Sequence, residues 1–332
     1  MTTAARTLLT GGSGFIGSHF HATLPNELLV NFDLVSPKFA CDSQYVAGNI
    51  RDIDRIRETL GQFKCQRILH LAAEHKDFGI KRDDYFLTNE HGTRNLCQVA
   101  TEFGIKEFVF YSSVAVYGAN NVPSTEALSP QPNSAYGESK LKGEAVLKQW
   151  AAEDPTRRVI IVRPAVVYGE RNVANMFRLI RQVKSGRYFH VGAANNVKSI
   201  AYVKNLVDAT LWLMENSSPG VVTYNYADKP QISSREIANR IAEEVGRRPP
   251  TTLPYWVLYL MALPFDLAIA LTGKDLPIST KRVTKLCTET FHRADKILEA
   301  GFQPRFTNLD GLRNMIQWMQ SDQFASEAIF DV

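Results

Sequence analysis

The sequence predicts an α/β fold in which a doubly wound parallel sheet carries a smaller C-terminal α/β lobe. Two observations predict it. Short, almost wholly apolar segments alternate with helical patterns as far as about residue 164, as expected for parallel strands covered by helices on both faces. A turn with glycines at positions 11, 14 and 17 joins the first apolar segment to the first helix, as in Rossmann-type folds. The chain has 332 residues and can therefore bury a large core.

The expected elements follow one another in strict alternation. Strands are expected at residues 6–10, 28–32, 46–50, 67–73, 107–113 and 158–164, and helices from about residue 15 and at 52–60, 84–103 and 135–153. In such sheets, ligands bind beyond the carboxyl ends of the strands. Ala73, Ser113 and Pro164 fall at such ends, on the same edge as the glycine turn. We therefore expect a single ligand site at this edge.

The glycine turn has the residue types that a dinucleotide requires. Gly11 permits a tight turn, Gly14 allows the backbone to approach a pyrophosphate, and Gly17 allows the helix to pack on the strand. The helix N-terminus adds N–H donors and a positive dipole. Asp33 ends the second strand about 20 residues later, where a carboxylate accepts hydrogen bonds from ribose hydroxyls and repels a 2′-phosphate. The cofactor is therefore expected to be NAD rather than NADP.

Tyr136 and Lys140 are four residues apart on an expected helix, so both side chains can face one pocket. A nearby ammonium favours the phenolate and lowers the tyrosine pKa from about 10 toward neutral pH. Proton transfer is most effective when the pKa of the base is close to the working pH. This pair therefore predicts a general base.

Composition limits the other possibilities. The chain has 38 basic and 34 acidic residues, a balance that gives no argument for a nucleic-acid partner. Its four cysteines lack paired or metal-like spacing, so we expect a reducing, cytoplasmic setting and no metal. Every long apolar stretch is interrupted before 18 residues, which argues against a membrane span. We divide the chain into an NAD-binding domain, residues 1–171 with sheet segments added from about 195–230, and a mainly substrate-binding lobe, residues 172–332.

Several motifs, taken together, resemble the extended short-chain dehydrogenase/reductase superfamily, in its branch of NAD-dependent sugar epimerases and dehydratases. The matching segments are residues 10–17, Asp33, residues 70–73, Asn89 within 88–93, Ser112 and Ser113 before Tyr117, Tyr136 with Lys140, and residues 163–169. A weaker match continues through residues 200–203, 294–297 and 301–302. The order and spacing of the first set make the resemblance specific over the first half of the chain.

The resemblance implies a role for each matching residue. Ser113, Tyr136 and Lys140 would be the catalytic residues. The implied cofactor-binding residues are Gly11, Gly14, Phe15, Ile16, Gly17, Asp33, Asn49, Ile50, Leu71, Ala72, Ala73, Asn89, Ser112, Tyr136, Lys140, Pro164 and Val167. Many relatives have Asp at the position of Asn49. Candidate substrate contacts are Glu74, His75, Ser113, Arg171, Asn175 and Lys198, of which the basic residues could bind a diphosphate.

The same resemblance narrows the reaction. The 4,6-dehydratases of the family carry an Asp-Glu pair where this chain has Val114 and Ala115, so dehydration is disfavoured. Residues 73–75, 169–172, 224–230 and 253–274 are similar to bacterial epimerases of N-acetylglucosamine on undecaprenyl diphosphate. We therefore expect a C4 epimerase of an N-acetylhexosamine linked to undecaprenyl diphosphate or UDP, serving surface-polysaccharide (O-antigen) biosynthesis.

Other functions remain open. One is a dehydrogenase with net turnover of NAD on a hydrophobic alcohol such as a sterol, and another is a soluble UDP-glucose 4-epimerase. A non-catalytic dinucleotide sensor is disfavoured by the intact set of Ser113, Tyr136 and Lys140. A homodimer is expected by resemblance, because the helices at residues 84–103 and 135–153 form a four-helix dimer contact in relatives.

Residues 253–271 are strongly apolar and are interrupted by Pro264 and Asp266. We expect two short helices joined at Pro264. These helices could make peripheral contact with the inner face of the cell membrane, or they could complete the core of the lobe or a dimer contact. Basic residues that suit a diphosphate or anionic headgroups follow at Lys274, Lys281, Arg282 and Lys285. The polar tail, residues 321–332, is expected to be frayed.

Overall fold

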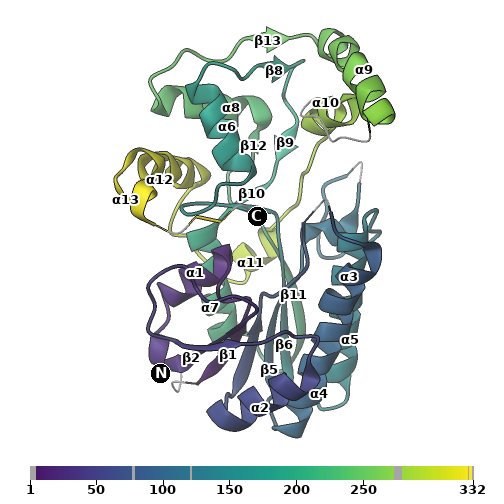
Figure 1. Ribbon diagram of the computed structural model, residues 1–332, viewed down its shortest axis with the longest axis vertical. Coiled ribbons are helices and arrows are strands. Elements are labelled where there is room, and N and C mark those ends of the chain that lie inside the picture. Colours follow the sequence, from purple (N-terminus) through teal and green to yellow (C-terminus); the bar gives the residue numbers. More distant parts are fainter. Residues whose placement is uncertain (1–4, 77–78, 120–121, 273–278, 328, 331–332) are drawn as a thin grey trace.

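The computed structural model describes residues 5–76, 79–119, 122–272, 279–327 and 329–330. Its centre is a seven-stranded sheet in the order β11-β6-β5-β4-β1-β2-β3, and all of its pairings are parallel (Figure 1). The strands are β1 (Thr7–Thr10), β2 (Leu29–Asp33), β3 (Gln44–Ala47), β4 (Arg67–His70), β5 (Glu107–Tyr111), β6 (Arg158–Pro164) and β11 (Gly220–Tyr226). The predicted doubly wound parallel sheet is confirmed.

Helices cover both faces of this sheet, and adjacent residues of a strand pack into the two apolar cores on opposite faces. Leu8 of β1 packs with α2, α4 and α5, whereas the adjacent Leu9 packs with α1 and α7, because successive side chains of a strand point to opposite faces. The helices are α1 (Phe15–His21), α2 (Ile53–Phe63), α4 (Thr93–Glu102), α5 (Ala135–Ala152) and α7 (Val203–Asn216). Two buried apolar layers therefore hold the sheet rigidly.

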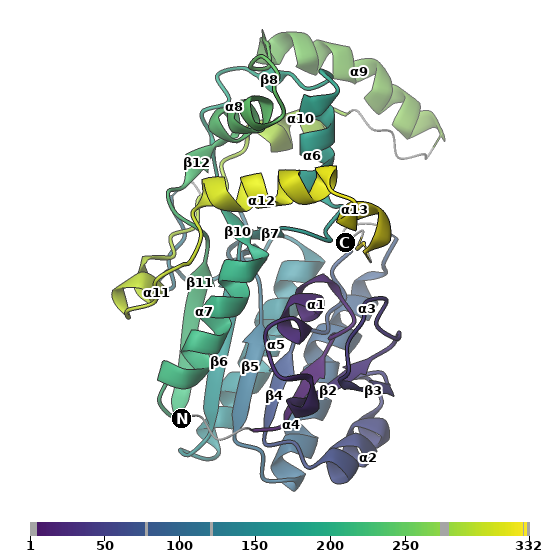
Figure 2. The same ribbon diagram turned by 90° about the vertical axis from the view of Figure 1, so that its left-hand side faces the viewer.

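The lobe lies beyond the carboxyl ends of the strands (Figure 2). Its core is formed by apolar faces of three helices, α6 (Asn175–Lys184), α8 (Ser234–Glu244) and α12 (Asn308–Gln320). Short strands connect them in two-stranded pairs: β7 (Val166–Tyr168) with β10 (Ile200–Tyr202), β9 (Val197–Lys198) with β12 (Ile232–Ser233), and β8 (His190–Val191) with β13 (Thr252–Leu253). The remaining short elements are η1 (Asn26–Leu28), η3 (Val114–Tyr117) and α11 (Asp295–Glu299).

The expectation of two apolar helices joined at Pro264 is wrong. A single helix, α9 (Tyr255–Thr272), continues through this proline. Contacts on both sides of Pro264 hold it in place: Ala262 is buried with residues of α10 (Thr280–Cys287), and the carboxylate of Asp266 accepts a hydrogen bond from Thr280 N at 3.1 Å. Lys274 and the side chains of Lys281, Arg282 and Lys285 lie outside the described residues. No helix in the described part of the chain is both long and apolar enough to cross a bilayer.

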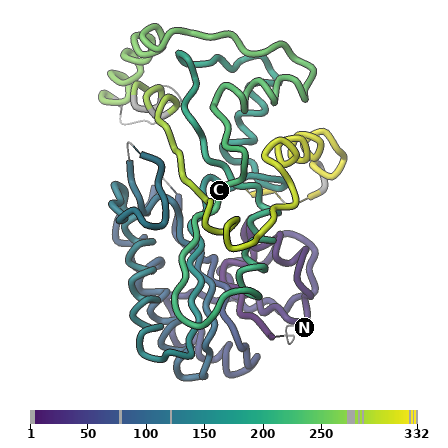
Figure 3. Tube along the Cα trace, turned by 180° about the vertical axis from the view of Figure 1, so that it is seen from behind, coloured from purple at the N-terminus to yellow at the C-terminus, as the bar shows by residue number. Residues whose placement is uncertain are grey.

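Three other expected segments differ from the structure. The helix expected at 84–103 is α3 (Arg82–Phe86), a wider turn η2 (Leu87–Gly92) with π-type hydrogen bonding, and α4. The strand expected at 46–50 is β3, which ends at Ala47; at the following Gly48 a Cβ would lie 2.2 Å from the ring of Phe32. The tail expected to be frayed forms α13 (Gln323–Ser326), and Phe330 pairs with Asn172. The last described residues therefore lie at the middle of the molecule, between sheet and lobe (Figure 3).

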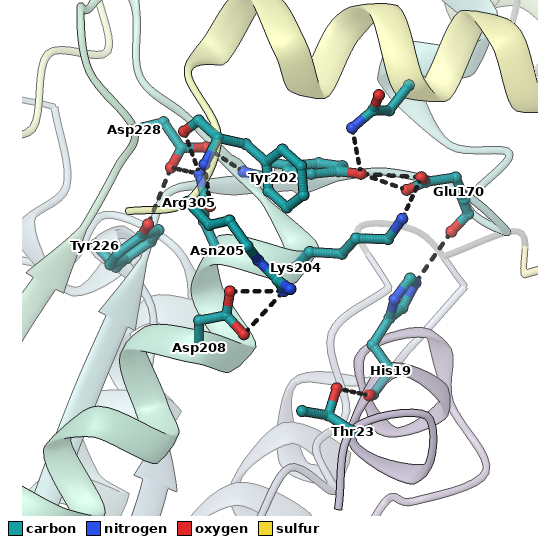
Figure 4. Close-up of polar contacts among 12 residues, drawn as sticks. His19, Thr23, Glu170, Tyr202, Lys204, Asn205, Asp208, Tyr226, Asp228 and Arg305 are labelled. Atoms are coloured by element: carbon teal, nitrogen blue, oxygen red, sulfur yellow. Dashed lines mark hydrogen bonds and ion pairs between the residues drawn. The ribbon is translucent and has the colours of Figure 1, made fainter. Parts of the chain in front are cut away.

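A partly buried polar network joins the lobe to the sheet half (Figure 4). The carboxylate of Glu170 accepts hydrogen bonds from Tyr202 OH at 2.9 Å and Lys204 Nζ at 2.7 Å. Its backbone carbonyl accepts one from the ring of His19, on α1, at 3.2 Å. Because these partners come from both halves of the molecule, the network fixes how the lobe sits over the edge of the sheet.

Candidate active site

The carboxyl ends of the strands and the facing edge of the lobe enclose a cavity of about 900 Å³. Its lining includes most of the residues that the sequence predicts for the site. These are Gly11, Gly14, Phe15, Ile16, Gly17, Asp33, Asn49, Ile50, Leu71, Ala72, Ala73, Glu74, His75, Ser112, Ser113, Tyr136, Lys140, Pro164, Val167 and Asn175. The topology therefore brings residues from distant parts of the chain to one place.

Three predicted site residues do not line this cavity: Asn89, Arg171 and Lys198. The side chain of Arg171 lies 3.5 Å from the carboxylate of Glu327. Lys198 donates a hydrogen bond from Nζ to the carbonyl of Thr288 at 2.5 Å. Both cations therefore have partners within the lobe.

Asn89 acts from behind the cavity wall. Its amide oxygen accepts a hydrogen bond from Glu74 N at 2.8 Å, and its amide nitrogen donates to the carbonyl of Glu74 at 2.9 Å. The same nitrogen donates to Ser139 Oγ at 2.9 Å. Asn89 thus fastens the loop after β4, which carries Glu74 and His75, to the helix of Tyr136.

The glycine turn fits a pyrophosphate group. Gly11 has a φ of +73°, and a Cβ there would lie 2.6 Å from Ala72 N, so a larger residue would collide with the backbone after β4 and distort the turn. Gly14 stands at the N-cap of α1, and no side chain caps this helix end. The N–H groups of a first helical turn have no partner within the helix, which suits an anion.

Asp33 lines the next part of the cavity and is fixed by backbone donors. Its carboxylate accepts hydrogen bonds from Ser13 N at 3.0 Å and Val35 N at 3.2 Å. Burial raises the pKa of this carboxyl group, while these hydrogen bonds oppose the shift. Each carboxylate oxygen keeps further acceptor capacity, which fits a diol such as a ribose.

A close approach between two elements puts Ser113 beside the helix of Tyr136. Ser113 follows β5 and caps η3, where its Oγ accepts a hydrogen bond from Ala115 N at 3.1 Å. Tyr136 is in the first turn of α5, which Ser134 caps through Gly137 N. A Cβ at Gly137 would lie 2.3 Å from Ala115 O. Only glycine therefore permits this contact between α5 and the serine turn.

Lys140 is almost completely buried, and its ammonium lies 4.2 Å from the centre of the Phe110 ring. Burial lowers the pKa of Lys140 to about 7, and the negative charge of Glu144 opposes this shift. The neighbouring His70 is held between Thr10 and Thr93, and burial lowers its pKa well below the ordinary value. Lys140 is thus an amine that titrates near neutral pH in an apolar setting, where its protonated form interacts strongly with a nearby phenol.

Sequence reasoning missed some of the cavity wall. The lobe contributes Asn172 and Met176, and the C-terminal segment contributes Ile329 and Phe330. Phe330 N donates to the carbonyl of Arg171 at 2.7 Å, so the chain end is paired to the lobe. The available signal was an adjacent pair of large apolar residues within a polar tail.

Comparisons with known proteins agree with this geometry. Residues 7–227 match the model of the NAD dependent epimerase/dehydratase family. The chain is 34% identical, over 94% of both chains, to the N-acetyl-alpha-D-glucosaminyl-diphospho-ditrans,octacis-undecaprenol 4-epimerase of Escherichia coli O157:H7. It is 26% identical to the decarboxylating sterol-4-alpha-carboxylate 3-dehydrogenase of Candida albicans, over 95% of this chain and 97% of the relative.

Solved structures show the same fold. The crystal structure of Thermus thermophilus UDP-glucose 4-epimerase in complex with NAD matches with a TM-score of 0.72 at 20% identity, covering 96% of this chain and 99% of that chain. The Bordetella bronchiseptica enzyme WbmG, in complex with NAD and UDP, matches with a TM-score of 0.73 at 19% identity, covering 99% and 98%. The whole chain, lobe included, therefore follows one known architecture.

Proposed function

The chain belongs to the NAD dependent epimerase/dehydratase family, and we propose that it inverts C4 of an N-acetylhexosamine carried on a diphosphate. It is an NAD-dependent sugar 4-epimerase of the extended short-chain dehydrogenase/reductase superfamily. The observation that carries the proposal is the placement of Ser113, Tyr136 and Lys140 around one cavity whose glycine turn fits a dinucleotide.

The residues beside Ser113 support epimerisation over dehydration. Val114 and Ala115 form the first half of η3 and offer no titratable side chain. A 4,6-dehydratase must expel the 6-hydroxyl group with the help of an acid, and this turn supplies none. An epimerase needs only a base that serves in both directions.

The proposed mechanism assigns one task to each residue. Tyr136 removes the proton from the 4-hydroxyl group of the sugar and later returns a proton to the same oxygen. Lys140 stabilises the phenolate, and Ser113 donates a hydrogen bond to the oxygen as charge develops. When bound, NAD supplies the hydride acceptor and donor at C4. Between the two transfers the 4-keto sugar turns over within the cavity, so that the opposite face is reduced.

We propose that the carrier is undecaprenyl diphosphate, in surface-polysaccharide biosynthesis such as that of O-antigen. The first support is the 34% identity to an epimerase whose name specifies an undecaprenol-linked sugar. The second is α9, which is predominantly apolar, with Asp266 as its charged residue, and packs on α10. Large side chains stay exposed along it, with Trp256 65%, Leu267 63% and Leu271 78% accessible.

We propose that α9 lies on the membrane surface. Monomeric proteins seldom expose apolar patches of this kind unless they bind a partner or a lipid surface. A helix that does not span the bilayer can still bury its apolar side chains among the headgroups, where tryptophan is favoured. Such a contact would hold the lobe next to the layer in which a polyprenyl substrate resides.

We also propose a homodimer built on α4 and α5, as the family resemblance implies. These helices pack side by side on one face of the sheet, so their outer sides form a continuous surface. Light scattering coupled to size exclusion should give twice the mass of the 37.3 kDa chain.

The experiment that tests the proposed function compares the two carriers in parallel. Purified protein with NAD receives N-acetylglucosamine on undecaprenyl diphosphate in one reaction and on UDP in the other, and the 4-epimer is identified by chromatography after release. We expect the lipid-linked sugar to be converted with the higher kcat/KM, without accumulation of NADH. Net formation of NADH would instead support a dehydrogenase that oxidises the sugar it is given.

A further inference from the structure

A buried ion pair lies directly behind the catalytic residues, and the mechanism described so far does not use it. Glu144 of α5 and Arg163 of β6 are both almost inaccessible to solvent. Arg163 binds the carboxylate with both arms of its guanidinium, from Nε to Oε1 at 2.8 Å and from Nη2 to Oε2 at 2.6 Å. Breaking such a pair is costly, yet an apolar pair of equal volume is often as stable. Stability alone therefore gives little reason for charges at this place.

The pair extends to the strand end that carries the catalytic serine. Ser112 Oγ donates a hydrogen bond to Glu144 Oε1 at 2.6 Å, and Ser112 immediately precedes Ser113. On the other side, Arg163 Nη1 donates to Tyr117 OH at 2.7 Å, and Tyr117 OH donates to Asn225 Oδ1 at 2.8 Å. The chain of contacts thus joins α5, the ends of β5 and β6, the serine turn and β11.

The pair also faces the catalytic lysine. Glu144 follows Lys140 by one helical turn, so both side chains lie on the same side of α5. The other groups that interact with the Lys140 ammonium are the Phe110 ring and His70, whose pKa is lowered by burial and by Lys140 itself. Tyr136 lies one turn before Lys140 on the same helix. Burial lowers the pKa of Lys140, and among the described residues the negative charge of Glu144 opposes this shift and so favours the protonated form.

The charges around Glu144 itself are also defined. Besides Arg163, the carboxylate lies 3.5 Å from the half-exposed ammonium of Lys148. Arg163 donates to Glu144 and Tyr117, and the charge that opposes the lowering of the Lys140 pKa by burial is that of Glu144. The burial of Lys140 would otherwise favour its uncharged form, which cannot stabilise a phenolate.

We propose that Glu144 is a positioning residue of the reaction: fixed by Arg163 and Ser112, its carboxylate keeps Lys140 charged and anchors the strand end that carries Ser113. The inference rests on the roles proposed for Tyr136 and Lys140. It gives a functional role to the buried charge of Glu144, which contacts neither substrate nor solvent.

The test is the pH dependence of kcat/KM for the Glu144→Gln variant, which keeps the shape and an acceptor oxygen but removes the charge. Without that charge Lys140 loses its proton more readily, so the alkaline limb should move to lower pH by about one unit. The phenolate of Tyr136 is then less stabilised, so the acid limb should move upward. Glu144→Asp, which restores the charge, should return both limbs toward the wild-type positions.

Glu170→Gln is the matched control. This carboxylate is also mostly buried and paired with a lysine, Lys204, but it belongs to the network between lobe and sheet rather than to Lys140. Its loss should lower stability and leave both limbs in place. If Glu144→Gln folds poorly, the double variant Glu144→Gln, Arg163→Gln leaves no unpaired buried charge and should shift both limbs in the same direction by a smaller amount, because the positive charge of Arg163 is removed as well.

A second arm needs no substrate. A double-mutant cycle of Glu144→Gln and Lys140→Met is measured by chemical unfolding at pH 6 and pH 9. We expect a coupling between the two residues at pH 6, where Lys140 is charged, that disappears at pH 9. The inference would be overturned if an active Glu144→Gln enzyme had the same pH profile of kcat/KM as the wild type, or if the cycle showed no coupling at pH 6. If the wild-type protein converts neither sugar, the proposed function is wrong. The double-mutant cycle would still show whether Glu144 and Lys140 are energetically coupled.

Discussion

The sheet half and the lobe contribute to the cavity in different ways. In the sheet half, Gly11, Asp33 and Ser113 reach the same cavity because each follows or ends a parallel strand. In the lobe, Arg171 and Lys198 also lie near strand ends, yet both are bound to other lobe residues. In a parallel sheet, residues that follow the strands are brought together at one edge. The short strands of the lobe form separate pairs and do not gather the residues that follow them in this way.

The two regions also differ in how they bury apolar surface. The sheet lies between two apolar layers, with Leu8 and Leu9 completely buried on opposite sides. In α9, Ala262 is completely buried while Trp256 and Leu267 remain mostly exposed. The first region is therefore complete as a folded unit, whereas the second retains a surface suited to a partner.

The largest effect is expected in the sheet half, from Tyr136→Phe. Loss of the phenol removes the base, and kcat should fall by about 10³-fold, while NAD binding is largely retained. The rate of 4-epimer formation measures this. Tyr85→Phe is the matched control, because the Tyr85 ring lies 6.5 Å from that of Tyr136 but does not line the cavity. A Tyr136→Phe enzyme with more than a tenth of the wild-type rate would rule out this base.

A second variant tests whether catalysis requires the close contact between α5 and the serine turn. Gly137→Ala places a methyl group against Ala115 O and forces α5 away from the serine turn. Separation of Ser113 from Tyr136 should lower kcat by about 10²-fold, since displacements near 1 Å have such effects. Gly61→Ala, in α2 with only a 3.6 Å contact to Phe103, is the control. It should raise the free energy of unfolding by about 0.5–1 kcal/mol.

The third variant, Lys140→Met, is expected to lower activity and raise stability at the same time. The folded chain releases this proton near pH 7, whereas the unfolded chain keeps it to about 10.5. Between these values the unfolded state binds more protons, so this group makes the free energy of unfolding rise with pH. Lys140→Met should abolish epimerisation and, without cofactor, stabilise the protein at pH 6 on the order of 2 kcal/mol.

That advantage should shrink toward pH 10, as urea unfolding at both values would show. The exposed Lys142, on the same helix, provides the control. Lys142→Met should change the free energy of unfolding by less than about 0.5 kcal/mol at either pH. A Lys140→Met protein that is less stable than the wild type at pH 6 would contradict the desolvation argument.

The smallest change in stability is expected in the lobe. The triple variant Trp256→Ser, Leu260→Ser, Leu267→Ser alters exposed positions of α9, so each change should cost no more than about 0.5 kcal/mol. Sedimentation with anionic lipid vesicles should nevertheless be lost. Leu258→Ser is the opposite case, because Leu258 packs against the buried cluster of α9 and α10.

Leu258→Ser should lower the free energy of unfolding by about 1–3 kcal/mol and leave vesicle binding by the folded protein intact. Equal vesicle binding by the triple variant and the wild type would show that α9 serves another partner, such as a second copy of the chain.

The sequence was sufficient for the order of the strands and helices at the cofactor edge of the sheet half, because their signals are local and the topology is regular. The spacing of Gly11, Gly14 and Gly17, with Asp33 after the next strand, was enough to predict the cofactor edge. The approach of α5 to the serine turn was not predictable, since it depends on Gly137 meeting Ala115 O. The contact joins α5 to η3, and the packing of these two elements cannot be inferred from a periodic pattern of apolar residues.

The lobe was harder to predict for a related reason. Pro264 indicated a break in the apolar segment, but contacts of Ala262 and Asp266 with α10 keep α9 continuous. Phe330 looked like part of a polar tail, and only its pairing with Asn172 brings it to the cavity. In both cases long-range contacts outweighed the local sequence signal.

The central claim is that Tyr136 serves as the base in both directions, while the hydride of C4 would be accepted by NAD and returned to the same carbon. The most direct measurement uses N-acetylglucosamine on undecaprenyl diphosphate with deuterium at C4, converted in ordinary water. We predict that the 4-epimer keeps the deuterium at C4 through many turnovers while the absorbance of NADH stays at its initial level. Product that has exchanged its C4 deuterium for solvent hydrogen, or NADH that grows with product, would contradict the account.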